Sequence, residues 1–155
     1  MLLPFFEWCE STRIASTIQG SIWLFPVIEA VHLLGLCLLG GSILLVDLRL
    51  MGIGLTRQTA SRLSYQARPW MMVAVITMIA TGLPLFLSEA IKCYYNQAFW
   101  VKITTLPFAL SFTFLIRDRI ARADRAGMYI RAITGASSVA LWFLVAAAGR
   151  WIGFS

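Results

Sequence analysis

Four ionisable side chains stand inside long apolar runs of the sequence, where a charge is costly. They are Glu29, His32, Lys102 and Arg150. Ionisable residues within membrane helices mark functional sites by default, because hydrocarbon does not solvate their charged forms. A carboxylate, an imidazole and two cations can pair with one another, carry protons or bind a metal. We expect the functional site of this protein among these four residues.

His32 is the one histidine of the chain, and Gly35 follows it by three residues. An imidazole binds iron through Nε2, and a glycine on the same helix face leaves room for the flat ring of a porphyrin. The alternative is that His32 hydrogen-bonds Glu29 or a neighbouring helix, while the glycine allows helices to pack closely. The spacing alone leaves both interpretations open.

Glu29 shares a helix face with His32, because the two residues are three positions apart. Counting about 1.5 Å of rise per residue places both in the same half of the membrane as Lys102 and Arg150. We predict that Glu29 is ionised and paired with Lys102, Arg150 or both, since an isolated carboxylate in hydrocarbon takes up a proton. In the alternative, such pairs only hold the bundle together, or the two cations reach the membrane surface without a partner.

The composition indicates that a membrane surrounds these side chains. Of the 155 residues, 59% are apolar and 13% are charged, whereas soluble domains average about 45–50% and about 25%. This excludes a water-soluble enzyme, a disordered chain and a disulfide scaffold. Apolar runs predict membrane spans at about 22–48, 69–88, 98–116 and 128–152. The expected fold is all-α: an integral membrane antiparallel four-helix bundle that forms a single domain over residues 1–155.

Two shorter helices are expected on the membrane surface. Residues 4–19 predict an N-terminal interfacial amphipathic helix, in which Phe5 and Trp8 recur near helical spacing while charged residues occupy other faces. The connection 51–68 predicts a second surface helix, because arginines alternate there with small polar residues.

The charge distribution predicts how the chain is oriented. The net charge is +6, and most of the arginines fall in two connections between apolar runs: Arg49, Arg57, Arg62, Arg68, Arg117, Arg119, Arg122, Arg125 and Arg131. This is the positive-inside pattern of cytoplasmic loops and needs no nucleic acid as a partner. We therefore expect a multi-pass protein of the bacterial inner membrane with both termini on the non-cytoplasmic side. Cys9 and Cys93 would share that side, and the sequence leaves open whether they form a disulfide.

Several stretches resemble known families of membrane proteins. The segment 23–35 (WLFPVIEAVHLLG), the later Asp47-Leu-Arg49-Leu and the C-terminal AGRWI look like an uncharacterised family of four-helix bacterial membrane proteins. More distantly, His32-Leu-Leu-Gly35 resembles the first helix of the HemJ-type protoporphyrinogen oxidases and of CopD-type membrane domains. The segment 99–102 (FWVK) resembles the opening of a later helix in the HemJ-type family. By this resemblance His32 is a haem ligand, and Lys102 is a neighbour of the haem pocket.

These observations together predict a b-type haem bound within the bilayer, with His32 on the iron and Glu29, Gly35, Lys102 and Arg150 around the cofactor. Electron transfer is the expected role. The alternatives are an enzyme of the HemJ-like oxidase type and a non-redox accessory subunit with a structural polar cluster. The redox partner is unknown, because no dinucleotide-binding glycine loop indicates an electron donor.

One histidine per chain also predicts a symmetric assembly. A low-spin haem needs two strong axial ligands, so we expect a homodimer in which each chain supplies His32 to one shared haem. Five-coordinate haem with one histidine per chain is the alternative. Ala132, Ala136 and Ala140 have the small-xxx-small spacing of a packing face, which would meet another helix of the chain or a second subunit.

Overall fold

The computed structural model describes residues 2–54, 57–123 and 126–152, and helices account for nearly all of them. No strand is present in these ranges, which confirms the all-α class. The elements are α1 (Leu3–Glu10), α2 (Arg13–Gln19), α3 (Leu24–Leu50), α4 (Ala60–Ser88), α5 (Ala90–Tyr95), α6 (Gln97–Ser111), the π-helical turn η1 (Phe112–Arg117), α7 (Asp118–Arg122) and α8 (Met128–Ile152).

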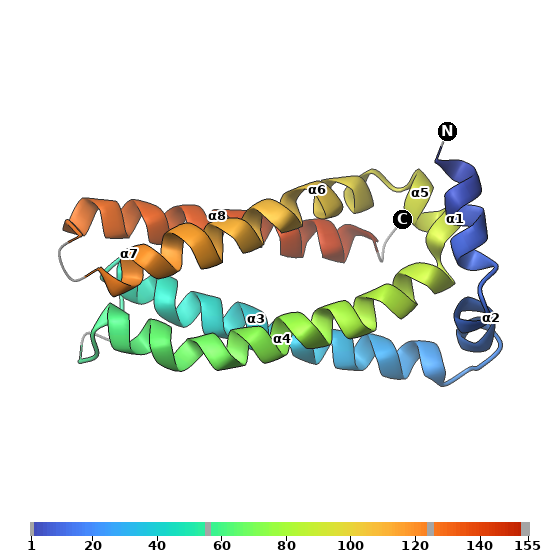
Figure 1. The fold of residues 1–155 in the computed structure, drawn as a ribbon, viewed down its shortest axis with the longest axis horizontal. Coiled ribbons are helices and arrows are strands. Elements are labelled where there is room, and N and C mark those ends of the chain that lie inside the picture. Colours follow the sequence, from blue (N-terminus) through green and yellow to red (C-terminus); the bar gives the residue numbers. More distant parts are fainter. Residues whose placement is uncertain (1, 55–56, 124–125, 153–155) are drawn as a thin grey trace.

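Four long helices run the length of the molecule (Figure 1). They are α3, α4, α8 and a continuous helix from Gln97 to Arg122 that joins α6, η1 and α7, and each is long and apolar enough to cross a membrane. Large apolar side chains point outward from them, including Leu34 (70% exposed), Phe108 (71%) and Ile133 (66%). Such a surface would drive association in water, whereas lipid chains accept it. The four-helix bundle is therefore as expected.

The boundaries of the middle helices differ from the prediction. Helix α4 begins at Ala60 and not near residue 69, so residues 60–68 form its first turns, and the prediction of a separate surface helix is wrong. The Thr59 hydroxyl caps this start by accepting a hydrogen bond from the Arg62 amide. Pro69 is tolerated inside the helix because neighbours in a membrane bundle satisfy the freed carbonyl. The third span continues past residue 116 to Arg122.

The long helices pack as two pairs that meet along one side. Helix α3 packs on α4, α6 packs on α8, and α3 also packs on α8 (Figure 1). Gly135 allows the contact of α8 with α3, because a Cβ atom on it would lie 2.8 Å from the Asp47 carbonyl oxygen. Ala136 and Ala140 are exposed, so the expected alanine face does not pack within the chain.

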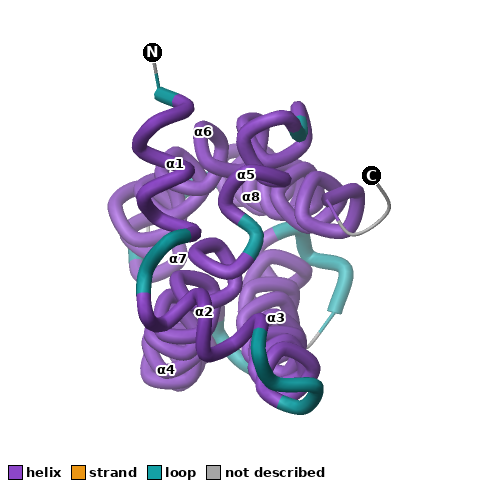
Figure 2. The backbone as a smooth tube through the Cα atoms, turned by 90° about the vertical axis from the view of Figure 1, so that its right-hand side faces the viewer, coloured by secondary structure: helices purple, strands orange, loops and turns teal. Residues whose placement is uncertain are grey.

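The two ends of the bundle differ in character. At the arginine end lie the end of α3, the start of α4, α7 and the start of α8; at the aromatic end lie α1, α2 and α5 (Figure 1). Figure 2 shows α1 and α2 lying across the aromatic end. The single helix predicted for residues 4–19 is in fact two helices, because the Thr12 side chain starts a new one by accepting from the Ala15 amide.

Candidate functional site

His32 lies on α3 with its ring against α4, about half buried. Its Nδ1 is 2.8 Å from the hydroxyl oxygen of Thr81. That hydroxyl has a single proton, which it donates to the Thr77 carbonyl oxygen at 2.6 Å. The Thr81 oxygen therefore accepts from His32, which puts the imidazole proton on Nδ1. Nε2 then keeps a free lone pair, which is the form of histidine that binds a metal or takes up a proton.

The glycines near His32 bring α3 and α4 close together. A Cβ atom on Gly82 would lie 3.2 Å from the His32 Cε1 atom. A Cβ atom on Gly35 would lie 3.2 Å from the Thr77 Cγ2 atom and 3.5 Å from the Met78 sulfur. The space beside Gly35 is thus occupied by α4, as the packing interpretation of this glycine requires. Met78 is near the level of His32, although its position in the sequence predicted a place in the other half of the bundle.

The other three predicted site residues do not gather into one cluster. The Lys102 side chain is partly buried, with its amine 3.5 Å from where a Cβ of Gly149 would lie, and its charge acts on His32. Glu29 is exposed and forms no ion pair among the described residues. Arg150 is exposed near the end of α8. The predicted pairing of Glu29 with Lys102 or Arg150 is absent, because Glu29 lies on the lipid-facing side of α3, near the helix end.

A second polar site, which the sequence analysis did not predict, is buried at the arginine end. The Arg117 guanidinium lies between two carboxylates: its Nε is 2.8 Å from Asp47 Oδ1, and its Nη1 is 2.7 Å from Asp118 Oδ1. The side chains of Arg117 and Asp47 are completely buried, and that of Asp118 is 5% exposed. A buried charge is stable only when it is paired and hydrogen-bonded, and this arrangement meets that requirement for the arginine.

Every long helix contributes to this site. The Arg117 Nη2 donates to the Ile43 carbonyl of α3 at 3.3 Å, and Nη1 approaches the Met71 sulfur of α4 at 3.8 Å. The Ser64 hydroxyl of α4 donates to Asp118 at 3.5 Å, and Ser138 of α8 faces Asp47. We call the set Asp47, Ser64, Arg117, Asp118 and Ser138 the buried ion network. It holds the four helices together where their own apolar contacts are interrupted.

The sequence analysis assigned Arg117 to a cytoplasmic loop, and that assignment is wrong. Arg117 follows an apolar run and precedes further arginines, so it reads as the start of a basic connection. The helix instead continues through η1 to Arg122, which carries Arg117 into the interior. One signal was available: Asp47 and Asp118 are rare acidic residues at the ends of apolar runs, in surroundings dominated by arginine.

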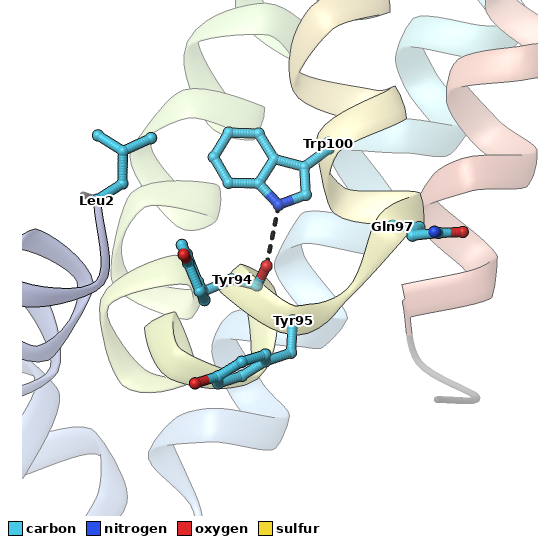
Figure 3. Close-up of a pocket in the computed structure, with 5 residues that line it drawn as sticks. All are labelled: Leu2, Tyr94, Tyr95, Gln97 and Trp100. Carbon is cyan, nitrogen blue, oxygen red and sulfur yellow. Dashed lines mark hydrogen bonds between the residues drawn. The ribbon is translucent and has the colours of Figure 1, made fainter.

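The aromatic end is closed by a cluster of rings. Phe6 of α1 packs edge-on against Phe86 and Phe99, which stack on each other with ring centroids 5.5 Å apart. A shallow groove of about 520 Å³ lies beside this cluster (Figure 3), where the Trp100 indole donates to the Tyr94 carbonyl oxygen at 2.9 Å. This groove is rich in tyrosine and tryptophan, as surfaces at the water boundary of a membrane are.

Cys9 and Cys93 both lie in the aromatic end, buried, and both are free thiols. Burial raises the pKa of Cys93 to about 11, and the negative charge of Glu89 adds to the effect. The thiolate is the reactive form of cysteine, so Cys93 is unreactive near neutral pH.

Comparison with known proteins identifies one related family. Residues 5–155 match the pattern of a family of unknown function, DUF6644. No curated protein and no solved structure matches the chain.

Proposed function

The chain belongs to the DUF6644 family of unknown function, and we propose that this member is a membrane protein that binds a b-type haem through His32 and transfers electrons. The observation that carries the proposal is the hydrogen bond from His32 Nδ1 to Thr81, which leaves Nε2 with its lone pair. Metal-ligating histidines commonly donate their other ring N–H in this way, which fixes the tautomer and orients the ring.

Haem suits this position better than a bare metal ion. His32 is the one histidine of the chain, so a metal bound there has to bring most of its ligands with it, as porphyrin iron does. The bound iron would supply one-electron transfer. Lys102 places a positive charge near the imidazole, and such a charge favours the reduced, less positive state of the iron.

The hydrogen bond to Thr81 is also what a purely structural histidine would make, so the experiment must test Nε2. Protein purified from haem-supplied cells should show a Soret band, and His32→Ala should lose it. Thr81→Val should keep haem but change the reduction potential, because Nδ1 loses its acceptor. Thr104→Val is the matched control, since the Thr104 hydroxyl bonds only carbonyls of its own helix. Colourless wild-type protein, or full haem in His32→Ala, would refute the proposal.

We propose further that two chains share the haem, each supplying one His32. The competing ligand is Met78, whose sulfur lies beside Gly35, one turn from His32. One haem per two chains with a bis-imidazole spectrum supports sharing. One haem per chain, with a spectrum that changes in Met78→Leu, would instead assign Met78 as the second ligand.

A second candidate function is protoporphyrinogen oxidation of the HemJ type. The observation that favours it is the placement of Lys102 near His32, since these are the two residues that the resemblance implies for that activity. Protoporphyrinogen added to the purified protein should then yield fluorescent porphyrin faster than in buffer, and Lys102→Met should slow the reaction. Equal rates with and without protein would exclude the oxidase.

For the orientation, we propose a bacterial inner membrane protein with the arginine end in the cytoplasm and both termini outside. The support is that both arginine-rich connections adjoin the same end of the bundle (Figure 1). Reporter fusions after the last residue test this, and an active cytoplasmic reporter there would reverse the orientation.

A further inference from the structure

A groove of about 400 Å³ lies between α4 and α7 at the arginine end. It is lined by Tyr65, Arg68, Pro69 and Met72 of α4 and by Arg122 of α7. The two arginines are far apart in sequence, and the packing of α7 on α4 brings them to one site. The groove lies where the apolar stretch of α4 begins, which is the depth of the lipid headgroups in a membrane that this helix spans.

The groove changes from polar to apolar along α4. Tyr65 and Arg68 lie toward the end of the bundle, and Met72 is one turn deeper on the same helix face, because residues three or four positions apart are neighbours. The same face continues inward as exposed apolar side chains, Ile76 (62% exposed), Ile79 (55%) and Leu83 (56%). At about 1.5 Å per residue, the path from Met72 to Leu83 is about 16 Å long. A basic mouth followed by a long apolar track matches a phospholipid in both chemistry and direction.

The two arginines have hydrogen-bond donors available at the mouth. Arg68 is exposed and makes no ion pair within the part of the chain that the structure describes. The Arg122 side chain is 38% exposed, and its one ion pair, Nη2 to Asp118 Oδ2, is 3.5 Å long. Asp118 is itself fixed by Arg117, so it orients Arg122 without using all its N–H groups. Guanidinium groups match phosphate oxygens in charge and in geometry.

We propose that this groove binds an anionic diacyl phospholipid, with the phosphate between Arg68 and Arg122 and one acyl chain along the α4 track. A free phosphate ion would use the arginines but not the track, whereas a lipid uses both. The site is separate from His32 and does not depend on haem binding. It also links lipid to the buried ion network, since Arg122 contacts both.

The test uses the full chain, purified in detergent and stripped of lipid. Phosphatidylglycerol and phosphatidylcholine with identical acyl chains are titrated separately, and retained lipid is counted by native mass spectrometry. Phosphatidylglycerol should bind, and phosphatidylcholine should bind at least fivefold more weakly. Arg68→Gln should weaken phosphatidylglycerol binding about fivefold, which corresponds to about 1 kcal/mol for one arginine at a membrane surface. Arg62→Gln is the control, because Arg62 is exposed on the same helix but does not line the groove.

Three outcomes would overturn the assignment. Equal retention of the two lipids would show that charge does not select the ligand. An equal loss in Arg68→Gln and Arg62→Gln would mean a general attraction to the basic end and not a defined groove. Displacement of phosphatidylglycerol by inorganic phosphate at millimolar concentration would assign the site to free phosphate. If Arg122→Gln fails to fold, Arg68→Gln still decides, since Arg68 has no partner whose loss would unfold the protein.

Discussion

Replacing Arg117 with methionine should destabilise the protein more than any other change of one charged residue. The substitution keeps most of the side-chain volume but removes the cation between Asp47 and Asp118. Two carboxylates are then left in the interior, with hydrogen bonds to Arg117 lost on both sides. Breaking a buried pair by removing one partner costs about 3–5 kcal/mol, because the remaining charge is uncompensated. For a chain of this size, about 2–4 °C per kcal/mol predicts a fall in Tm of about 6–20 °C.

The assay is thermal unfolding in detergent, followed by near-ultraviolet circular dichroism. The matched control is Arg119→Met, an exposed arginine two positions along, which should change stability by less than about 0.5 kcal/mol. A triple variant, Asp47→Asn with Asp118→Asn and Arg117→Met, should recover part of the loss, because no unpaired charge remains. If Arg117→Met melts with the control, or the triple variant is less stable than Arg117→Met, the reasoning about the network is wrong.

Three further predictions concern other parts of the molecule. Gly135→Ala should cost about 1–3 kcal/mol, because its Cβ would lie 2.8 Å from a backbone oxygen of α3; Gly41→Ala, with no neighbour within 4 Å, should be tolerated in the same melting assay. Cys93 should make stability fall between pH 9.0, its ordinary pKa, and about 11, its raised value, since the folded state holds the thiol proton more tightly and loses this advantage as pH rises; Cys93→Ala should remove the decline, and an unchanged decline would reject that origin. Lys102→Met should lower the reduction potential of the His32 haem by tens of millivolts, because a nearby positive charge is lost, whereas a shift as large in Lys92→Met would show that the effect is not local.

The helical architecture could be predicted from the sequence because membrane spans depend mainly on the length of apolar runs. The span predicted at 128–152 coincides with α8, and the one at 22–48 differs from α3 by two residues at each end. Helix α4 was misjudged at its start, since residues 60–68 are polar on several sides and depend on the Thr59 cap and on packing to be helical. Hydropathy does not report such local contacts.

The candidate site was predicted less well, because it depends on which helix faces which. The sequence singled out His32 and Lys102, and the structure brings them near each other, but no pattern indicated Thr81 as the partner of His32. Glu29 was expected to pair on the basis of its helix face alone, and a small rotation about α3 is enough to turn it to the exterior. Arg117 was missed because arginine at the end of an apolar run ordinarily lies in a loop.

The π-helical turn η1 has a consequence for which sequence changes this protein tolerates. A π turn holds one residue more than a regular turn and so shifts the phase of all that follows by about 100°. This lets one helix pack on α8 through α6 and on α4 through α7. Leu115 and Ile116 of this turn are exposed and can be exchanged for other apolar residues. Deleting either would restore regular winding and turn Arg117 away from Asp47, so in this segment the number of residues matters more than their identity.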